Sequence, residues 1–171
     1  MNKNICSGCP LCINGIYGTG SLLIDKQKQQ ILLVTDNTTP YTDIGDFIDQ
    51  STDITTHTNK ILYEKSFKLI SQNVNNCIYF DVPYGMFHKY RIYVIFINNN
   101  DISCRKFNNS NSNNMINGLK HMIAISIKQF KDEYATSGKI TNLKVATDRS
   151  KIKIDDRIVS IMYELIRCNL I

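Results

Sequence analysis

The sequence predicts a single α/β domain, because apolar segments of strand character alternate with two segments of helical character. Residues 31–36, ILLVTD, and residues 90–97, YRIYVIFI, are rich in β-branched and aromatic side chains, as strands are. The segments that follow Asp53 and Asp155 instead repeat their apolar residues at helical spacing. The chain has 171 residues, which is enough for one domain with a sizeable core and too few for two ordinary domains.

A hairpin is expected near the start of the sheet. Residues 21–24, SLLI, and residues 31–36 are short apolar runs joined by the strongly polar sequence DKQKQQ. Two apolar runs with a polar connection are typical of a pair of antiparallel strands with a solvated loop.

A loop and a helix are expected between residues 41 and 70, and the functional hypotheses centre on them. Gly45 lies in a short turn, and Asp53 is the expected N-cap because its side-chain oxygen can accept an amide hydrogen of the first helical turn. The helix is expected to continue towards Ile70 and to bury one face, which carries Ile54, Thr58, Ile61, Leu62 and Leu69.

Two more strands and a loop are expected after this helix. Residues 77–82 form a strand that ends at Pro83 and Gly85, whereas residues 90–97 are almost continuously apolar and are expected to lie centrally with both faces buried. Asparagine and serine dominate residues 98–117. That segment has too little apolar area to offset the entropy of ordering, so a mobile loop is predicted there.

The C-terminal part is expected to add a strand and a last helix. Residues 121–127, HMIAISI, have strand character, and the sequence KQFKDEYA after them favours a turn or a short helix. Either Asp155 or Asp156 caps the last helix. Its apolar stripe is expected to belong to the core and consists of Ile158, Ile161, Met162 and Leu165.

The formal charge of +5 and the sequence pI of about 8.8 favour an anionic partner such as a nucleotide or RNA, although surface lysines that serve solubility account for the same charge. No stretch reaches the ~18 apolar residues of a membrane helix, and no signal peptide is evident. We therefore expect a soluble intracellular protein and no membrane partner. Heavy use of Asn, Ile and Lys indicates an AT-rich source such as a large DNA virus, which would place the protein in the host cytoplasm.

Three cysteines near the N-terminus form a separate candidate metal site. Cys6, Cys9 and Cys12 have the spacing C-x2-C-x2-C within a Cys-rich segment, residues 1–20. Thiolates at this spacing can converge on a structural zinc ion, which prefers four ligands, so a fourth ligand must come from elsewhere in the chain. The alternative is a set of free thiols in a flexible leader.

The sequence KILYEKS resembles the helix of the Nudix hydrolase family, whose motif is a glycine, five residues, a glutamate, seven residues, then Arg-Glu-apolar-any-Glu-Glu and a closing glycine. In this comparison Lys60 stands at the arginine and Ile61 at the first helix glutamate. Glu64 keeps the middle glutamate, Lys65 replaces the last one, and Gly45 matches the first glycine one residue out of register. The resemblance is to a degenerate Nudix box, and to Nudix proteins of large DNA viruses.

The resemblance implies a Nudix-like α/β/α sandwich around a mixed sheet, formed by residues 21–171. It also implies a metal-pyrophosphate site, in which helix carboxylates bind Mg²⁺ or Mn²⁺ and activate water. Hard cations need several oxygen ligands, but the matching helix face here presents Ile61, Glu64 and Lys65. Loop carboxylates that would compensate are those of Asp46, Asp49 and Asp53.

Three functional hypotheses follow. The first is a catalytically inactive Nudix-fold protein that binds a nucleotide, a capped RNA 5′ end or a protein partner, with Lys60, Lys65 and Gly45 at the ligand and Glu64 as a remnant of the catalytic set. The second is an active, divergent pyrophosphohydrolase that uses Mg²⁺ or Mn²⁺ on a nucleotide substrate or on capped mRNA. The third is a structural or assembly module with zinc on the cysteines.

Overall fold

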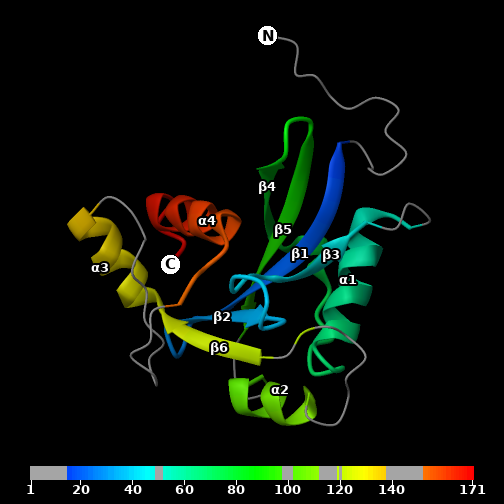
Figure 1. The fold of residues 1–171 in the computed structure, drawn as a ribbon, viewed down its shortest axis with the longest axis horizontal. Coiled ribbons are helices and arrows are strands. Elements are labelled where there is room, and N and C mark those ends of the chain that lie inside the picture. Colours follow the sequence, from blue (N-terminus) through cyan, green and yellow to red (C-terminus); the bar gives the residue numbers. More distant parts are fainter. Residues whose placement is uncertain (1–14, 49–51, 98–101, 112–118, 120, 138–151) are drawn as a thin grey trace. The chain divides into compact units, whose positions relative to one another are not determined.

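The computed structural model describes residues 15–48, 52–97, 102–111, 119, 121–137 and 152–171, and Figure 1 gives the arrangement of the chain within each part. The predicted mixed α/β fold is confirmed. In chain order the elements are β1 (Ile16–Asp25), β2 (Gln30–Thr35), β3 (Ile44–Phe47), α1 (Ile54–Lys65), the 3-10 turn η1 (Val74–Asn76), β4 (Ile78–Tyr84), β5 (His88–Ile97), α2 (Cys104–Asn111), β6 (His121–Ser126), α3 (Ile127–Ser137) and α4 (Asp156–Arg167).

Six strands are hydrogen-bonded in the order β4-β5-β1-β2-β6, and β3 also pairs with β1. The pairs β1–β2, β1–β3, β2–β6 and β4–β5 are antiparallel. Contacts divide the chain into two compact units. Unit 1 consists of Met1–Ser21 and Ile44–Ile95, and unit 2 of Leu22–Asp43 and Phe96–Ile171, so that the strand β1 contributes to both.

Helix α1 of unit 1 begins where the sequence predicts and ends earlier. Asp53 is the N-cap, and its side chain accepts the amide hydrogens of Thr55 and Thr56. The expected continuation towards Ile70 is wrong, because Phe67 and Lys68 have φ values of 55° and 63°, a left-handed conformation that no helix continues through. The predicted face is only partly correct: Thr58, Ile61 and Leu62 are buried, Ile54 is half-buried, and Leu69 lies beyond the helix.

The β4–β5 hairpin of unit 1 matches the predicted strands and extends past Pro83. Proline lacks a backbone N–H, and it is tolerated here because β4 lies at an edge of the sheet. Gly85, with a φ of +64°, makes the turn. Strand β5 is a buried inner strand, as predicted, and the phenol of its Tyr90 donates to the carbonyl of Thr19, 2.9 Å away.

Unit 2 pairs β2 with β6 over six residue pairs and includes α2, α3 and α4. The loop predicted for residues 98–117 contains helix α2 at residues 104–111, because Ile102 and Phe107 supply the apolar anchors that the asparagine-rich composition obscures. Asp155 caps α4, which settles one of the two predicted alternatives. The predicted stripe is confirmed as core, since its four members are at most 1% exposed: Ile158, Ile161, Met162 and Leu165.

Candidate functional site

Helix α1 presents a single carboxylate where the Nudix resemblance requires three. Glu64 is exposed in the last turn of the helix, and Lys60 is exposed one turn before it. Ile61, at the position of the first helix glutamate, is 5% exposed and packs in the core of unit 1. The helix therefore turns that position inward, where an ionised side chain is strongly disfavoured.

Lys65 and Gly45, which the sequence analysis placed at the ligand, lie together in unit 1. The ammonium of Lys65 donates to the carbonyl oxygen of Gly45 at 2.9 Å. It also forms an ion pair with Asp46, with 2.7 Å between Nζ and Oδ2. The ion pair was missed at the sequence level, because nothing in the spacing chooses among the carboxylates before the helix. It brings a carbonyl, a carboxylate and an ammonium to one point between β3 and α1.

The environment of Asp46 favours its ionised form. Burial raises the pKa of this carboxyl, but the hydrogen bond from Lys65, the amide hydrogen of Phe47 and the positive charge of Lys65 together outweigh burial and leave the pKa below its ordinary value. The side chain of Lys65 is 22% exposed and that of Asp46 is 48% exposed. Because water reaches the pair, its net contribution to stability is about 0–1 kcal/mol.

The two described carboxylates of this segment, Asp46 in strand β3 and Asp53 before α1, do not assemble into a cation site. Asp46 is neutralised by Lys65, and Asp53 is committed to the N-cap of α1, where hydrogen bonds from Thr56 lower the pKa of its carboxyl. Asp49 lies outside the described residues. Among the residues that the structure describes, no group of three or more His, Cys, Asp or Glu side chains is placed to hold a metal ion. The described residues Gly45 and Asp46 thus hold the ammonium group of Lys65, and within the described part of the chain no set of ligands for Mg²⁺ or Mn²⁺ is assembled.

The predicted zinc ligands Cys6, Cys9 and Cys12 lie outside the described residues, so the zinc hypothesis stays a prediction. Cys77, Cys104 and Cys168 are free thiols. Burial raises the pKa of Cys104 to about 11, which keeps this thiol protonated near neutral pH.

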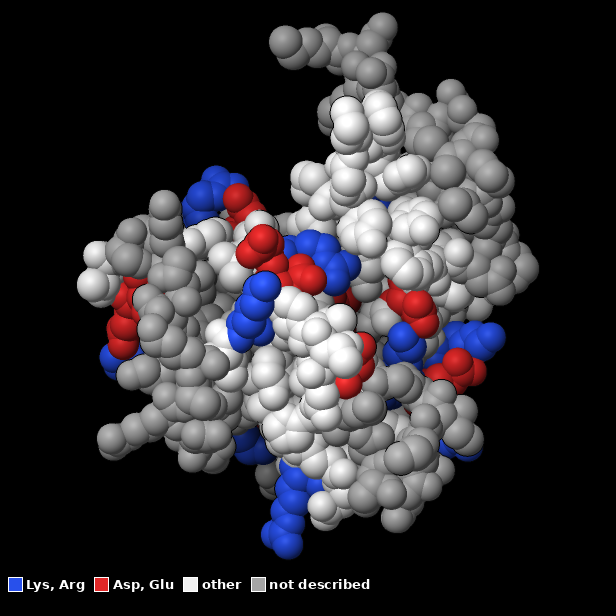
Figure 2. All heavy atoms as spheres, viewed as in Figure 1, with Lys and Arg blue, Asp and Glu red and all other residues white. Residues whose placement is uncertain are grey.

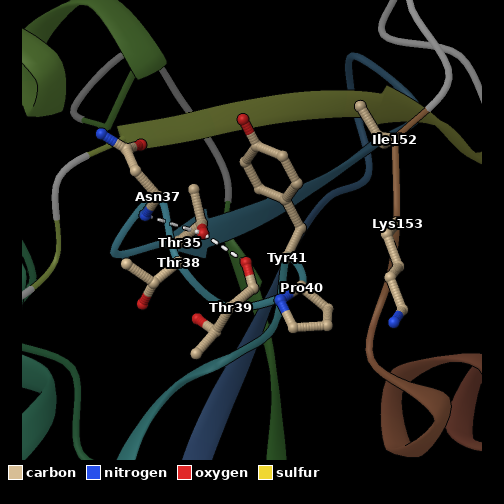
Figure 3. Close-up of a pocket in the computed structure, with 8 residues that line it drawn as sticks. All are labelled: Thr35, Asn37, Thr38, Thr39, Pro40, Tyr41, Ile152 and Lys153. Atoms are coloured by element: carbon tan, nitrogen blue, oxygen red, sulfur yellow. Dashed lines mark hydrogen bonds between the residues drawn. The ribbon is translucent and has the colours of Figure 1, made fainter.

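A cavity of about 490 Å³ lies in unit 2, beside the turn that follows β2. In Figure 3 the ring of Tyr41 stands between the turn residues on one side and Ile152 and Lys153 on the other. Sequence reasoning missed this cavity, because the residues on its two sides are more than a hundred positions apart. It is lined by Thr35, Asn37, Thr38, Thr39, Pro40, Tyr41, Ile152 and Lys153.

Short-range hydrogen bonds make the turn side of the cavity rigid. One carboxylate oxygen of Asp36 accepts the backbone and hydroxyl hydrogens of both Thr38 and Thr39 at 2.8 to 2.9 Å, which holds the pKa of Asp36 far below its ordinary range. The hydroxyl of Thr35 donates to the carbonyl of Thr39 and accepts the amide hydrogen of Asn37 (Figure 3). The threonine hydroxyls are therefore engaged within the turn.

The opposite side of the cavity is joined to the start of α4. Tyr41 and Ile154 form a parallel bridge. The backbone carbonyl of Tyr41 accepts the amide hydrogen of Asp155, and the backbone amide of Tyr41 donates to the carbonyl of Lys153, both at 2.9 Å. The phenol oxygen of Tyr41 lies 3.1 Å from Nδ1 of His121, and burial raises the pKa of this phenol. An aromatic ring, an aliphatic side chain and an ammonium group thus border one cavity.

Charged side chains of both signs lie close together on the face shown in Figure 2. Elsewhere in the described residues too, charges of opposite sign are paired, as in the ion pairs of Asp81 with Arg91 and of Glu164 with Arg167. The formal charge of +5 is thus the net value of interleaved charges of both signs.

Comparison with solved structures identifies the fold. A MutT structure, from work on the enzymes of Aliivibrio salmonicida and Vibrio cholerae, matches with a TM-score of 0.53 at 8% identity over 89% of this chain and 97% of the other. An Ap4A hydrolase of C. elegans matches with a TM-score of 0.56 at 10% identity over 90% of this chain and 98% of the other. Both are Nudix hydrolases. This chain has the Nudix fold.

Identities of 8% and 10% carry the Nudix fold and not the activities of those proteins. No protein-family model matches the sequence, and no curated protein does. Within the described part of the chain, no helix is long and apolar enough to span a membrane.

Proposed function

We propose that this chain is a Nudix-fold protein that binds a nucleotide or a capped RNA 5′ end without hydrolysing it. The observation that carries the proposal is the composition of the α1 face, where Ile61 is buried in the core and Glu64 is the one carboxylate. Metal-assisted hydrolysis of a pyrophosphate needs a cation that is balanced by several oxygen ligands and able to activate water. One exposed carboxylate does not supply that set.

The cavity of unit 2 supports the binding half of the proposal. Its volume of about 490 Å³ lies within the range of small-molecule sites, which is roughly 300–1,000 Å³. A nucleobase stacks on an aromatic face, and a phosphate attracts an ammonium group, so the ring of Tyr41 and the ammonium of Lys153 match the two ends of a nucleotide. Asn37 adds an amide that both donates and accepts hydrogen bonds.

The test measures binding and turnover side by side. Nucleoside triphosphates, a dinucleoside polyphosphate and a capped RNA oligonucleotide are each titrated by calorimetry, and each is then incubated with Mg²⁺ or Mn²⁺ and analysed for products by chromatography. We expect saturable binding of at least one probe with no product above the rate without protein. Absence of binding to every probe would contradict the proposal.

Two variants locate the ligand. Tyr41→Ala removes the stacking ring and should weaken binding about 5- to 150-fold, because stacking of one base contributes about 1–3 kcal/mol. Lys153→Ala should weaken binding of phosphorylated ligands more than that of the free nucleoside. Lys128→Ala is the matched control, since this lysine of α3 is 79% exposed and lies outside the cavity lining.

An active, divergent pyrophosphohydrolase is the second candidate, and it is favoured by the exposure of Glu64 on the helix. It predicts turnover in Mn²⁺ that Glu64→Gln abolishes. Turnover that survives this substitution would remove the catalytic role of Glu64.

A further inference from the structure

The ammonium group of Lys65 joins two oxygen atoms that suit a metal ion. Its Nζ lies 2.9 Å from the carbonyl oxygen of Gly45 and 2.7 Å from a carboxylate oxygen of Asp46. Carbonyl and carboxylate oxygens are hard donors of the kind that Mg²⁺ and Mn²⁺ select. In this chain both oxygens instead contact the ammonium group of Lys65.

We propose that Lys65 is the resident cation of this site, so that the degenerate box takes up no divalent cation and the protein binds its anionic ligand without one. The statement about the ligand rests on the proposed function. The statement about the cation rests on the contacts of Lys65 alone, and the two can fail separately.

Two features keep the ammonium in this place. Lys65 is the last residue of α1, where the partial negative charge of the helix C-terminus favours a cation. The side chain of Lys65 is 22% exposed, so most of it is shielded from water. A divalent ion would have to displace this ammonium group or lie beside it. Two positive charges in contact with the same oxygen atoms repel each other.

The proposal predicts that reversing one charge creates a cation site. Lys65→Glu places a third oxygen donor beside Gly45 and Asp46. Lys60→Glu is the matched control, because it makes the same change of net charge on an exposed lysine of the same helix. Mn²⁺ binding is measured by electron paramagnetic resonance and by the shift in Tm when Mn²⁺ is added.

We expect Lys65→Glu to bind one Mn²⁺ at least tenfold more tightly than either the wild type or Lys60→Glu, with a rise in Tm on addition of Mn²⁺. Adding Asp46→Asn to Lys65→Glu should remove that gain. Equal Mn²⁺ affinity in the wild type and in Lys65→Glu would overturn the proposal. A gain of the same size in Lys60→Glu would overturn it as well, because the effect would then follow from net charge.

Two further results cover a variant that does not fold and a ligand that does not bind. If Lys65→Glu is unfolded without metal, its refolding on addition of Mn²⁺ supports the proposal. If it does not refold, Lys65→Gln is measured in its place. A folded Lys65→Gln that binds Mn²⁺ no better than the wild type then counts against the proposal. ADP is the probe for ligand binding, and its affinity for the wild type should agree within twofold in EDTA and in Mn²⁺. An ADP affinity that requires Mn²⁺ refutes binding without metal, whereas no ADP binding in either condition refutes the proposed function for this nucleotide and leaves the Mn²⁺ result standing.

Discussion

Replacing Ile61 with glutamate restores the residue that the Nudix motif has at this position and tests whether the position is closed to water. Ile61 is 5% exposed in the core of unit 1, so the substitution loses about 1.5–3 kcal/mol of apolar burial. The carboxyl group that replaces it must also leave water, which raises its pKa in the folded state above the value of about 4.3 in the unfolded chain.

The raised pKa makes the cost of Ile61→Glu depend on pH. Below about pH 4.3 the carboxyl is protonated in both states, and only the apolar term remains. As the pH rises, the unfolded chain releases the proton while the folded chain holds it, so stability falls by about 1.4 kcal/mol for each pH unit up to the folded pKa. If the folded pKa is near 7, as in other buried carboxyls, the total cost is about 5–7 kcal/mol at pH 7.5. That is comparable with the whole stability of a small domain, about 5–15 kcal/mol.

Urea denaturation followed by circular dichroism at pH 4.5 and pH 7.5 measures this difference. Ile61→Val, which keeps the site apolar, is the control and should cost about 0.5–1.5 kcal/mol at both pH values. A cost for Ile61→Glu below about 1 kcal/mol at both pH values would refute the reasoning, because the side chain would then reach water and the face of α1 would be open to a second carboxylate.

Two further substitutions test the packing of each unit by the same urea denaturation. Gly18→Ala places a Cβ 2.6 Å from the ring of Tyr90 and should cost about 1–3 kcal/mol, and a cost that stays the same with Tyr90→Leu in the background would contradict this clash. Asp155→Ala removes the α4 cap and should cost about 1–2 kcal/mol near neutral pH, whereas exposed Asp132→Ala should cost under about 0.5. Burial raises the pKa of Asp155, but the hydrogen bonds that it accepts from Arg157 outweigh burial and leave the pKa lowered. The stabilisation by this carboxylate is therefore present above about pH 3.9 and is lost as the pH falls through the folded pKa. A stability difference between the wild type and Asp155→Ala that stays constant down to about pH 2 would contradict this account.

Local signals in the sequence were sufficient for most elements of the fold. Two apolar runs with a polar connection predicted the β1–β2 hairpin. Asp53 marked the start of α1, and Asp155 or Asp156 that of α4, because an N-cap is a contact within three residues. The errors lie where distant contacts override composition. Helix α2 forms within an asparagine-rich segment because Phe107 is fully buried.

For the candidate site, too, some features follow from the sequence and others only from the tertiary structure. The sequence by itself determined that the Nudix box is degenerate, because the identities of residues 60–65 are enough to show that two of the three helix carboxylates are replaced. Only the tertiary structure decided that Ile61 faces the core, that Lys65 reaches Gly45 and Asp46, and that Tyr41 borders a cavity with Lys153. Those contacts join residues that are 19 to more than 100 positions apart. No pattern of residue types along the chain specifies which of several carboxylates or carbonyls a lysine will meet.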